Sequence, residues 1–195
     1  VIGCGDTTSA LTGTEGEVKS ANGSFVVEKG DYVYFINGKG ELTADNTFGK
    51  PEKGALMRVK TADLANVENA TAEVVIPKIL LSESYKTGVY FYGDYVFYAT
   101  PSLKKDKKGN IKTDETEFYK FNLKTGKNDG SEIAVSADNM TEYRFVEVDG
   151  KVYLLFVETE THDEHTHNTL KVYNATDKKE VYTSSSPLFL NCKII

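Results

Sequence analysis

The chain contains no tryptophan and only two cysteines, two methionines and four prolines among its 195 residues. Two cysteines cannot build a network of disulfides, and a chain of this length can bury a core without one. No run approaches the roughly 20 consecutive apolar residues that a membrane-spanning helix needs. The sequence therefore predicts a folded part whose stability comes from its own hydrophobic core.

Positive charge is also in short supply. The 23 Lys and Arg residues face 29 Asp and Glu residues, which gives a formal net charge of −6. This balance opposes the attraction to phosphate that supplies most nucleic-acid affinity. We therefore expect no nucleic acid among the partners.

Signatures of common catalytic sites are missing as well. The chain has no Gly-x-Ser-x-Gly motif and no glycine-rich loop of the phosphate-binding type. Carboxylates such as Asp31 and Asp94 occupy turn positions that recur along the chain, where structure already explains them. We therefore predict no catalytic residue, no enzyme activity and no organic cofactor.

What the chain does have is a repeated segment rich in aromatic residues. Gly30-Asp31-Tyr-Val-Tyr-Phe returns as Gly93-Asp94-Tyr-Val-Phe-Tyr, and more loosely as Asp149-Gly150-Lys-Val-Tyr-Leu. Aromatic and β-branched residues fit a pleated sheet, and Gly-Asp and Asp-Gly pairs favour tight hairpins. A period of about 55 to 65 residues built from short strands is typical of radially repeated β-sheets.

Each repeat is predicted to contain four antiparallel strands. The expected segments are 24–28, 32–36, 55–60 and 74–76 in the first, 89–91, 95–99, 117–123 and 133–135 in the second, and 145–148, 151–157, 170–173 and 181–182 in the third. Arg58, Lys120 and Lys171 occupy one position of the third strand, flanked by apolar residues. Alternation predicts that this position lies on a solvent-exposed face.

The pattern resembles a known group of proteins. A Gly-Asp or Asp-Gly turn, a Tyr-rich second strand and a Lys124-Thr125-Gly126 type of turn after the third strand resemble the propeller domains of exported Gram-positive lipoproteins, which are distantly similar to the YWTD propellers of lipoprotein receptors. The resemblance covers about residues 22–186 and implies an all-β fold of β-propeller-type four-stranded antiparallel blades. The Trp-Thr-Asp of the receptor repeat is absent, so no receptor ligand is implied.

About three blades are expected, at 22–80, 85–137 and 141–186, followed by the start of a further strand rich in apolar residues. Propeller rings usually need four to eight blades, so the sequence predicts a partial or open propeller. A longer protein, self-association or an open arrangement of sheets would each explain the deficit, and the first is favoured. A β-sandwich is the alternative fold, because alternation alone does not distinguish the two.

The first 21 residues are predicted to form a separate, polar segment. Val1-Ile2-Gly3-Cys4 resembles the end of a bacterial lipoprotein signal, which makes Cys4 a lipidation site and the stretch behind it a flexible spacer. The alternative is a free Cys4 or a disulfide with Cys192. Lipidation predicts an extracytoplasmic protein that is anchored to the bacterial cell membrane only through its lipid.

All three histidines fall within six residues, at His162, His165 and His167. Imidazoles near carboxylates are typical ligands of zinc, nickel or copper, so this loop is the candidate metal site. The competing interpretation is a solvated hairpin loop, which the sequence favours because no rigid scaffold is evident. A possible divalent metal is the one inorganic cofactor considered.

Three functions follow from these observations. The leading hypothesis is a non-enzymatic, surface-anchored module that binds a protein, peptide or glycan through loops carried on rigid blades, with its ligand-binding residues unidentified. The second is a metal sensor or scavenger that uses the histidine-rich loop. The third is a set of non-catalytic blades from a larger propeller hydrolase. The strand tyrosines could supply stacking platforms for a ligand, although core packing explains most of them: Tyr32, Tyr34, Tyr90, Tyr92, Tyr95 and Tyr98.

Overall fold

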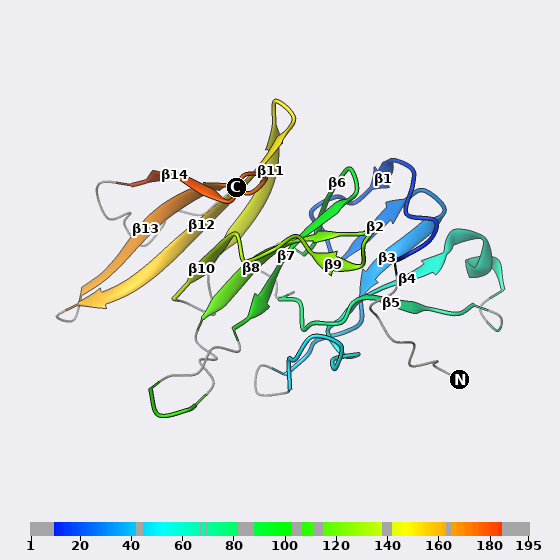
Figure 1. Cartoon of the computed structure of the whole chain (residues 1–195), viewed down its shortest axis with the longest axis horizontal. Helices are drawn as coiled ribbons and strands as arrows, with labels where there is room; N and C mark the ends of the chain where they lie inside the picture. The colour runs from blue at the N-terminus through cyan, green and yellow to red at the C-terminus, as the bar shows by residue number, and fades with distance from the viewer. Residues whose placement is uncertain are drawn as a thin grey trace.

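A computed structural model of the chain describes residues 10–41, 45–66, 68, 70–81, 88–102, 107–110, 115–137, 142–162 and 165–184. These residues form three antiparallel sheets that follow one another along the sequence (Figure 1). The prediction of an all-β protein built from antiparallel sheets is confirmed, although two of the three sheets have five strands where four were predicted. No helix among the described residues has the length and apolar character needed to cross a bilayer.

The first sheet has the strand order β1-β2-β3-β4-β5. A short 3₁₀ helix, η1 (Thr61–Ala65), lies between its last two strands. The strands are β1 (Val18–Ser20), β2 (Val26–Lys29), β3 (Tyr32–Ile36), β4 (Leu56–Lys60) and β5 (Glu73–Ile76).

The second sheet has the order β10-β8-β7-β6, with the short β9 paired to β8. The third has the order β11-β12-β13-β14. Their strands are β6 (Tyr90–Tyr92), β7 (Tyr95–Pro101), β8 (Thr116–Asn122), β9 (Lys127–Asn128), β10 (Ala134–Ser136), β11 (Tyr143–Val148), β12 (Lys151–His162), β13 (His165–Asn174) and β14 (Lys179–Thr183).

The repeated Gly-Asp and Asp-Gly pairs form two-residue turns between the first two long strands of each sheet. Lys29 pairs with Tyr32, Tyr92 with Tyr95, and Val148 with Lys151. Gly30 and Gly93 adopt φ of +57°, whereas Asp149 and Gly150 both have positive φ, at +51° and +76°. Positive φ at the first or at both central residues gives hairpin turns whose twist matches that of the strands. The predicted role of Asp31, Asp94 and Asp149 as turn residues is confirmed.

Two apolar layers hold the three sheets together. The layer between the first and second sheets includes Tyr34, Leu56, Phe91 and Tyr98, and the layer between the second and third includes Phe97, Phe118 and Phe156. Successive residues of β7 therefore serve different layers, since side chains alternate between the faces of a strand. The second sheet is buried on both faces.

The outer face of the third sheet remains partly exposed. Val146 and Val148 of β11 are 38% and 50% exposed, and Tyr182 of β14 is 53% exposed. On the first sheet, Val26 is 48% exposed. The two terminal sheets therefore carry apolar side chains on surfaces that no described sheet covers.

The third-strand cations contradict the prediction of a solvent-exposed position. Arg58 and Lys120 are only 1% and 8% exposed. Each is paired with an acid: Arg58 Nε with Glu73 at 2.6 Å, Lys120 Nζ with Asp129 at 2.8 Å, and Lys171 with Glu158. Arg58 and Lys120 also lie 4.1 Å from the ring centres of Tyr32 and Tyr95, which occupy equivalent positions at the start of the second strand. Acids from neighbouring segments and aromatic rings make this buried charge tolerable.

The segment expected to be a flexible spacer also differs from its prediction where the structure describes it. β1 pairs with β2, and Gly30 N donates a hydrogen bond to the Glu17 carbonyl at 3.1 Å. The Thr12 carbonyl accepts a hydrogen bond from Arg58 Nη2 at 2.7 Å. Backbone pairing rather than apolar periodicity orders this segment, so the sequence pattern did not reveal it. Residues 1–9, with Cys4, lie outside the described residues, as does Cys192.

Candidate functional site

The connections of the three sheets divide between two ends. The β3–β4, β7–β8 and β12–β13 connections lie at one end of their sheets, which we call the loop end. The links from one sheet to the next, β5–β6 and β10–β11, leave from the same end. The two-residue turns lie at the opposite end, the turn end. In Figure 1 the described parts of the β3–β4 and β7–β8 connections lie below the sheets, whereas the β6–β7 and β11–β12 turns lie at the top.

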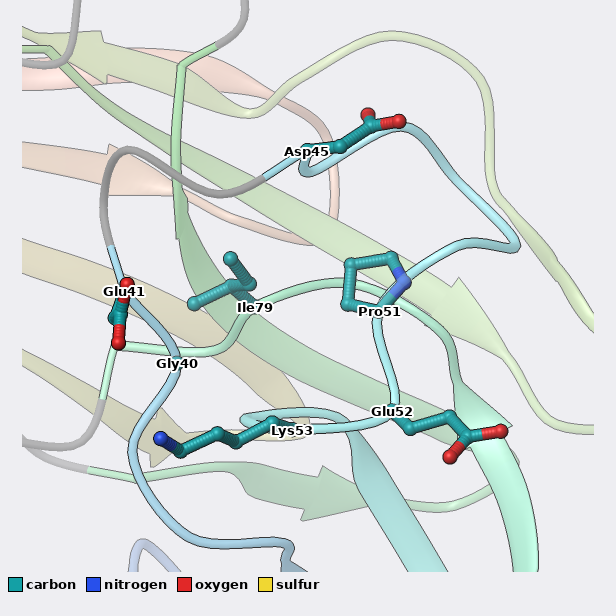
Figure 2. A pocket seen from close by; sticks show the side chains of 7 residues that line it. All are labelled: Gly40, Glu41, Asp45, Pro51, Glu52, Lys53 and Ile79. Atoms are coloured by element: carbon teal, nitrogen blue, oxygen red, sulfur yellow. The ribbon is translucent and has the colours of Figure 1, made fainter.

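A small hollow of about 170 Å³ lies at the loop end of the first sheet. Its wall comes from the β3–β4 connection, and Ile79 of the link to the second sheet contributes its base (Figure 2). Figure 2 shows Lys53 running toward the side of Glu41, whereas the carboxylate of Glu52 points away. The lining residues are Gly40, Glu41, Asp45, Pro51, Glu52, Lys53 and Ile79.

The hollow has an apolar base and a charged rim. Ile79 is 2% exposed and Pro51 is buried, whereas Glu41 and Lys53 are exposed. Hydrogen bonds from Thr47 lower the pKa of the Asp45 carboxyl, so this group remains ionised at neutral pH. The surface can therefore receive a small apolar group and contact charges of both signs beside it.

Glycine is required where the backbone passes the base of the hollow. A Cβ on Gly40 would lie 2.7 Å from Ile79 Cγ2. Gly54 has φ of +81°, and a Cβ there would lie 2.9 Å from the Gly40 nitrogen. These contacts fix the distance between the β3–β4 connection and Ile79, and thereby the depth of the hollow.

The Asn46 side chain and carbonyl form hydrogen bonds with two other segments at the loop end. Its Nδ2 donates to Thr100 Oγ1 and to the Pro101 carbonyl, both at 3.0 Å, and its Oδ1 accepts from Ile79 N at 2.7 Å. The Asn46 carbonyl accepts a 2.9 Å hydrogen bond from Lys78 Nζ. Burial lowers the pKa of Lys78, and the nearby Glu117 carboxylate opposes that shift. One asparagine thus joins three segments that are distant in sequence.

Replacing Asn46 with alanine is expected to lower the free energy of unfolding by about 2–4 kcal/mol, because the backbone nitrogen of Ile79 and the Pro101 carbonyl lose buried partners. Asn46 is 1% exposed. Urea denaturation followed by circular dichroism measures the loss. The control is Asn37→Ala, which removes a solvent-exposed hydrogen bond from Nδ2 to the Glu52 carbonyl at 3.1 Å. Equal losses in the two variants would contradict the role assigned to Asn46.

The predicted histidines lie at the free end of the β12–β13 hairpin. The sequence analysis placed them in a loop, but β12 ends at His162 and β13 begins at His165, so the strands extend further than predicted. His162 pairs with His165, and His167 pairs with Glu160. This end belongs to the loop end, since it links the second and third strands of its sheet. Within the part whose side chains are described, no cluster of three or more potential metal ligands is found, and residues 160–165 lie outside that part.

The strand tyrosines are mainly core residues. Tyr34 and Tyr98 are fully buried, Tyr32 is 9% exposed, and Tyr92 is the most exposed of the six strand tyrosines, at 37%. Burial raises the pKa of Tyr34 and outweighs the opposing effect of Arg58. The described part of the chain therefore does not bring these rings together as a stacking surface.

Sequence reasoning did not identify Asn46, Ile79 or Lys53 as functional candidates. Ile79 follows a proline-containing link, and Asn46 lies in a polar stretch, so neither belongs to a periodic pattern. The one usable signal was the length of the β3–β4 connection with its several glycines, which is unusual for a hairpin link. Comparison with models of known protein families and with curated proteins finds no match for this chain.

Proposed function

We propose that this chain is a non-enzymatic binding module from an exported, lipid-anchored bacterial protein, and that its three sheets are blades of a β-propeller. The anchor rests on the sequence around Cys4. The absence of catalysis rests on the carboxylates of the repeat: Asp31, Asp94 and Asp149 lie in two-residue turns at the end opposite the hollow. Their positions serve the hairpins, so structure accounts for them without a reaction.

The arrangement of the sheets supports the propeller. Each sheet contains an up-and-down series of four strands, and consecutive sheets pack through an apolar layer. In a propeller every blade face packs against the next blade. A propeller blade has apolar side chains on the face that packs against the next blade. The third sheet has such exposed side chains at Val146, Val148 and Tyr182, where a fourth blade would pack.

The hollow at the loop end is the observation that carries the binding function. It lies in connections that differ between the repeats, whereas the strands and turns are repeated. Binding residues are often found on variable loops held by a rigid scaffold. The Asn46 hydrogen bonds and the contact of Gly40 with Ile79 provide that rigidity.

The chemistry of the hollow favours a peptide segment as the ligand. Its base is aliphatic, at Ile79 and Pro51, and its volume is below the roughly 300–1,000 Å³ of sites for drug-sized molecules. One aliphatic side chain fits this size, and the rim charges of Glu41 and Lys53 can contact the polar backbone on either side. Among the described residues, none that lines the hollow is aromatic, as a sugar-stacking site would require.

The test compares binding of a fluorescently labelled tetrapeptide with leucine at its second position to the wild type and to two double variants. Glu41→Ala with Lys53→Ala removes the rim and is expected to weaken binding about tenfold, equivalent to about 1.4 kcal/mol. The matched control, Lys127→Ala with Asp149→Asn, changes one exposed lysine and one exposed carboxylate at the turn end. Asparagine tolerates the positive φ of position 149.

Fluorescence anisotropy measures the three affinities. Unchanged binding by the control and weaker binding by the rim variant would support the proposal. Equal affinities in all three proteins, or no binding of the peptide by the wild type, would overturn it. Titration with an N-acetylglucosamine tetramer forms a second arm, and binding of that sugar alone would overturn the assignment of a peptide ligand.

A further inference from the structure

The end of the β12–β13 hairpin has a feature that the proposed peptide site does not use. β12 and β13 form an antiparallel ladder that runs from the pair Tyr153–Asn174 to the pair His162–His165. Only two residues, 163 and 164, separate the strands at that end. The free end of the hairpin projects at the lower left of Figure 1.

The register assigns four potential metal ligands to one face of this hairpin. Directly opposite residues of an antiparallel pair belong to the same face, and so do residues two apart along a strand. His162 is opposite His165, and Glu160 is opposite His167. Positions 160, 162, 165 and 167 therefore share a face, whereas Thr161 and its partner Thr166 belong to the other face.

The spacing of these positions suits a single metal ion. Opposite residues have Cβ atoms about 4.5–5.5 Å apart, and residues two apart along a strand lie about 6.5–7 Å from each other. Zinc binds imidazole nitrogen and carboxylate oxygen at about 2.0–2.2 Å, usually with four ligands in a tetrahedron. Three imidazoles and one carboxylate on a patch of this size match that requirement in number and type.

The hairpin also supplies the rigid support that the sequence did not reveal. Phe156 is fully buried and Glu158 is 6% exposed, so the strands are anchored in the core close to the four positions. Glu158 pairs with Lys171 and accepts a hydrogen bond from Ala137 N at 3.2 Å. The positive charge of Lys171 is thereby neutralised on the face that would carry the metal.

We propose that Glu160, His162, His165 and His167 form a binding site for a divalent transition metal ion of the zinc type at the end of this hairpin. The site belongs to the loop end but is separate from the hollow, so it stands independently of peptide binding. The ligands act as deprotonated imidazoles and carboxylate, and protons therefore compete with the metal.

The decisive variant keeps the amino-acid composition of the hairpin but moves one histidine to the opposite face. In His165→Thr with Thr166→His, one imidazole moves to the face of Thr161 while the chain retains three histidines in six residues. Calorimetric titration of the full, tag-free chain with zinc is expected to give one ion per chain in the wild type with a micromolar Kd. The exchanged variant is expected to bind at least tenfold more weakly.

Two further comparisons complete the experiment. Glu160→Gln is expected to weaken zinc binding several-fold, whereas Thr161→Ala on the opposite face is expected to leave it unchanged. Cobalt titration of the wild type should give the intense visible absorption of a tetrahedral site, and circular dichroism verifies that each variant is folded. No zinc binding by the wild type, or equal binding by the exchanged variant, would overturn the proposal.

Discussion

Replacing Phe118 with alanine is expected to lower the free energy of unfolding by about 3–5 kcal/mol, the range typical of a fully buried aromatic residue. Phe118 is 0% exposed and lies in the layer between the second and third sheets. Its ring stacks on Phe156 with a centroid distance of 5.2 Å and meets Tyr143 edge-on at 5.3 Å. Because Phe118 belongs to the second sheet and both of these partners belong to the third, the cavity would separate surfaces that the ring now joins.

Urea denaturation of the wild type and the Phe118→Ala variant measures this loss. Tyr182→Ala is the control, since it also truncates an aromatic residue but one that is 53% exposed, and we expect it to cost less than about 1 kcal/mol. If Phe118→Ala cost no more than this control, the third sheet would not be packed on the second as described.

Replacing Arg58 with alanine is expected to cost about 2–4 kcal/mol, somewhat less than the loss of one partner from a fully buried ion pair, because Glu73 is half exposed and regains water. Arg58 also donates to the Thr12 carbonyl at 2.7 Å and to Tyr34 Oη at 3.3 Å. The alanine variant leaves that carbonyl without this donor. The free energy of unfolding and limited proteolysis of the N-terminal segment measure the two consequences.

Two other substitutions serve as comparisons for Arg58→Ala. Arg58→Lys keeps the charge but loses the planar group that contacts Glu73, Thr12 and the ring of Tyr32, so an intermediate loss is expected. Lys151→Ala removes an exposed ion pair with Asp177, in which the atoms are 3.5 Å apart, and should cost less than about 1 kcal/mol. A loss in Arg58→Ala as small as in Lys151→Ala would contradict the structural role of the buried guanidinium.

The local features of the fold could be predicted from the sequence because they are encoded within a few residues. Gly30-Asp31, Gly93-Asp94 and Asp149-Gly150 determine two-residue turns directly, and alternation of apolar residues identifies the strands beside them. The same signals predicted four strands in each repeat but missed the short β1 and β9, which add a fifth strand to the first and second sheets. These predictions needed no knowledge of which sheet packs on which.

Features that depend on tertiary contacts could not be predicted in this way. Arg58 looks like an exposed residue in an alternating strand, and its burial depends on contacts with Glu73, Thr12 and the rings of Tyr32 and Tyr34. Asn46 has no periodic neighbours, although its hydrogen bonds join three segments of the loop end. Because β12 extends to His162, the strand register places the three histidines on one face with Glu160. Composition alone does not reveal this arrangement.

Residue-resolved amide chemical shifts of the ¹⁵N-labelled chain show directly whether a ligand binds at the loop end. Titration with the leucine tetrapeptide is predicted to shift the amides of Gly40, Glu41, Lys53 and Ile79, which surround the hollow. The amides of Gly30, Gly93 and Gly150 in the two-residue turns should remain unchanged. Shifts confined to the turn end, or an unchanged spectrum, would contradict ligand binding at the loop end.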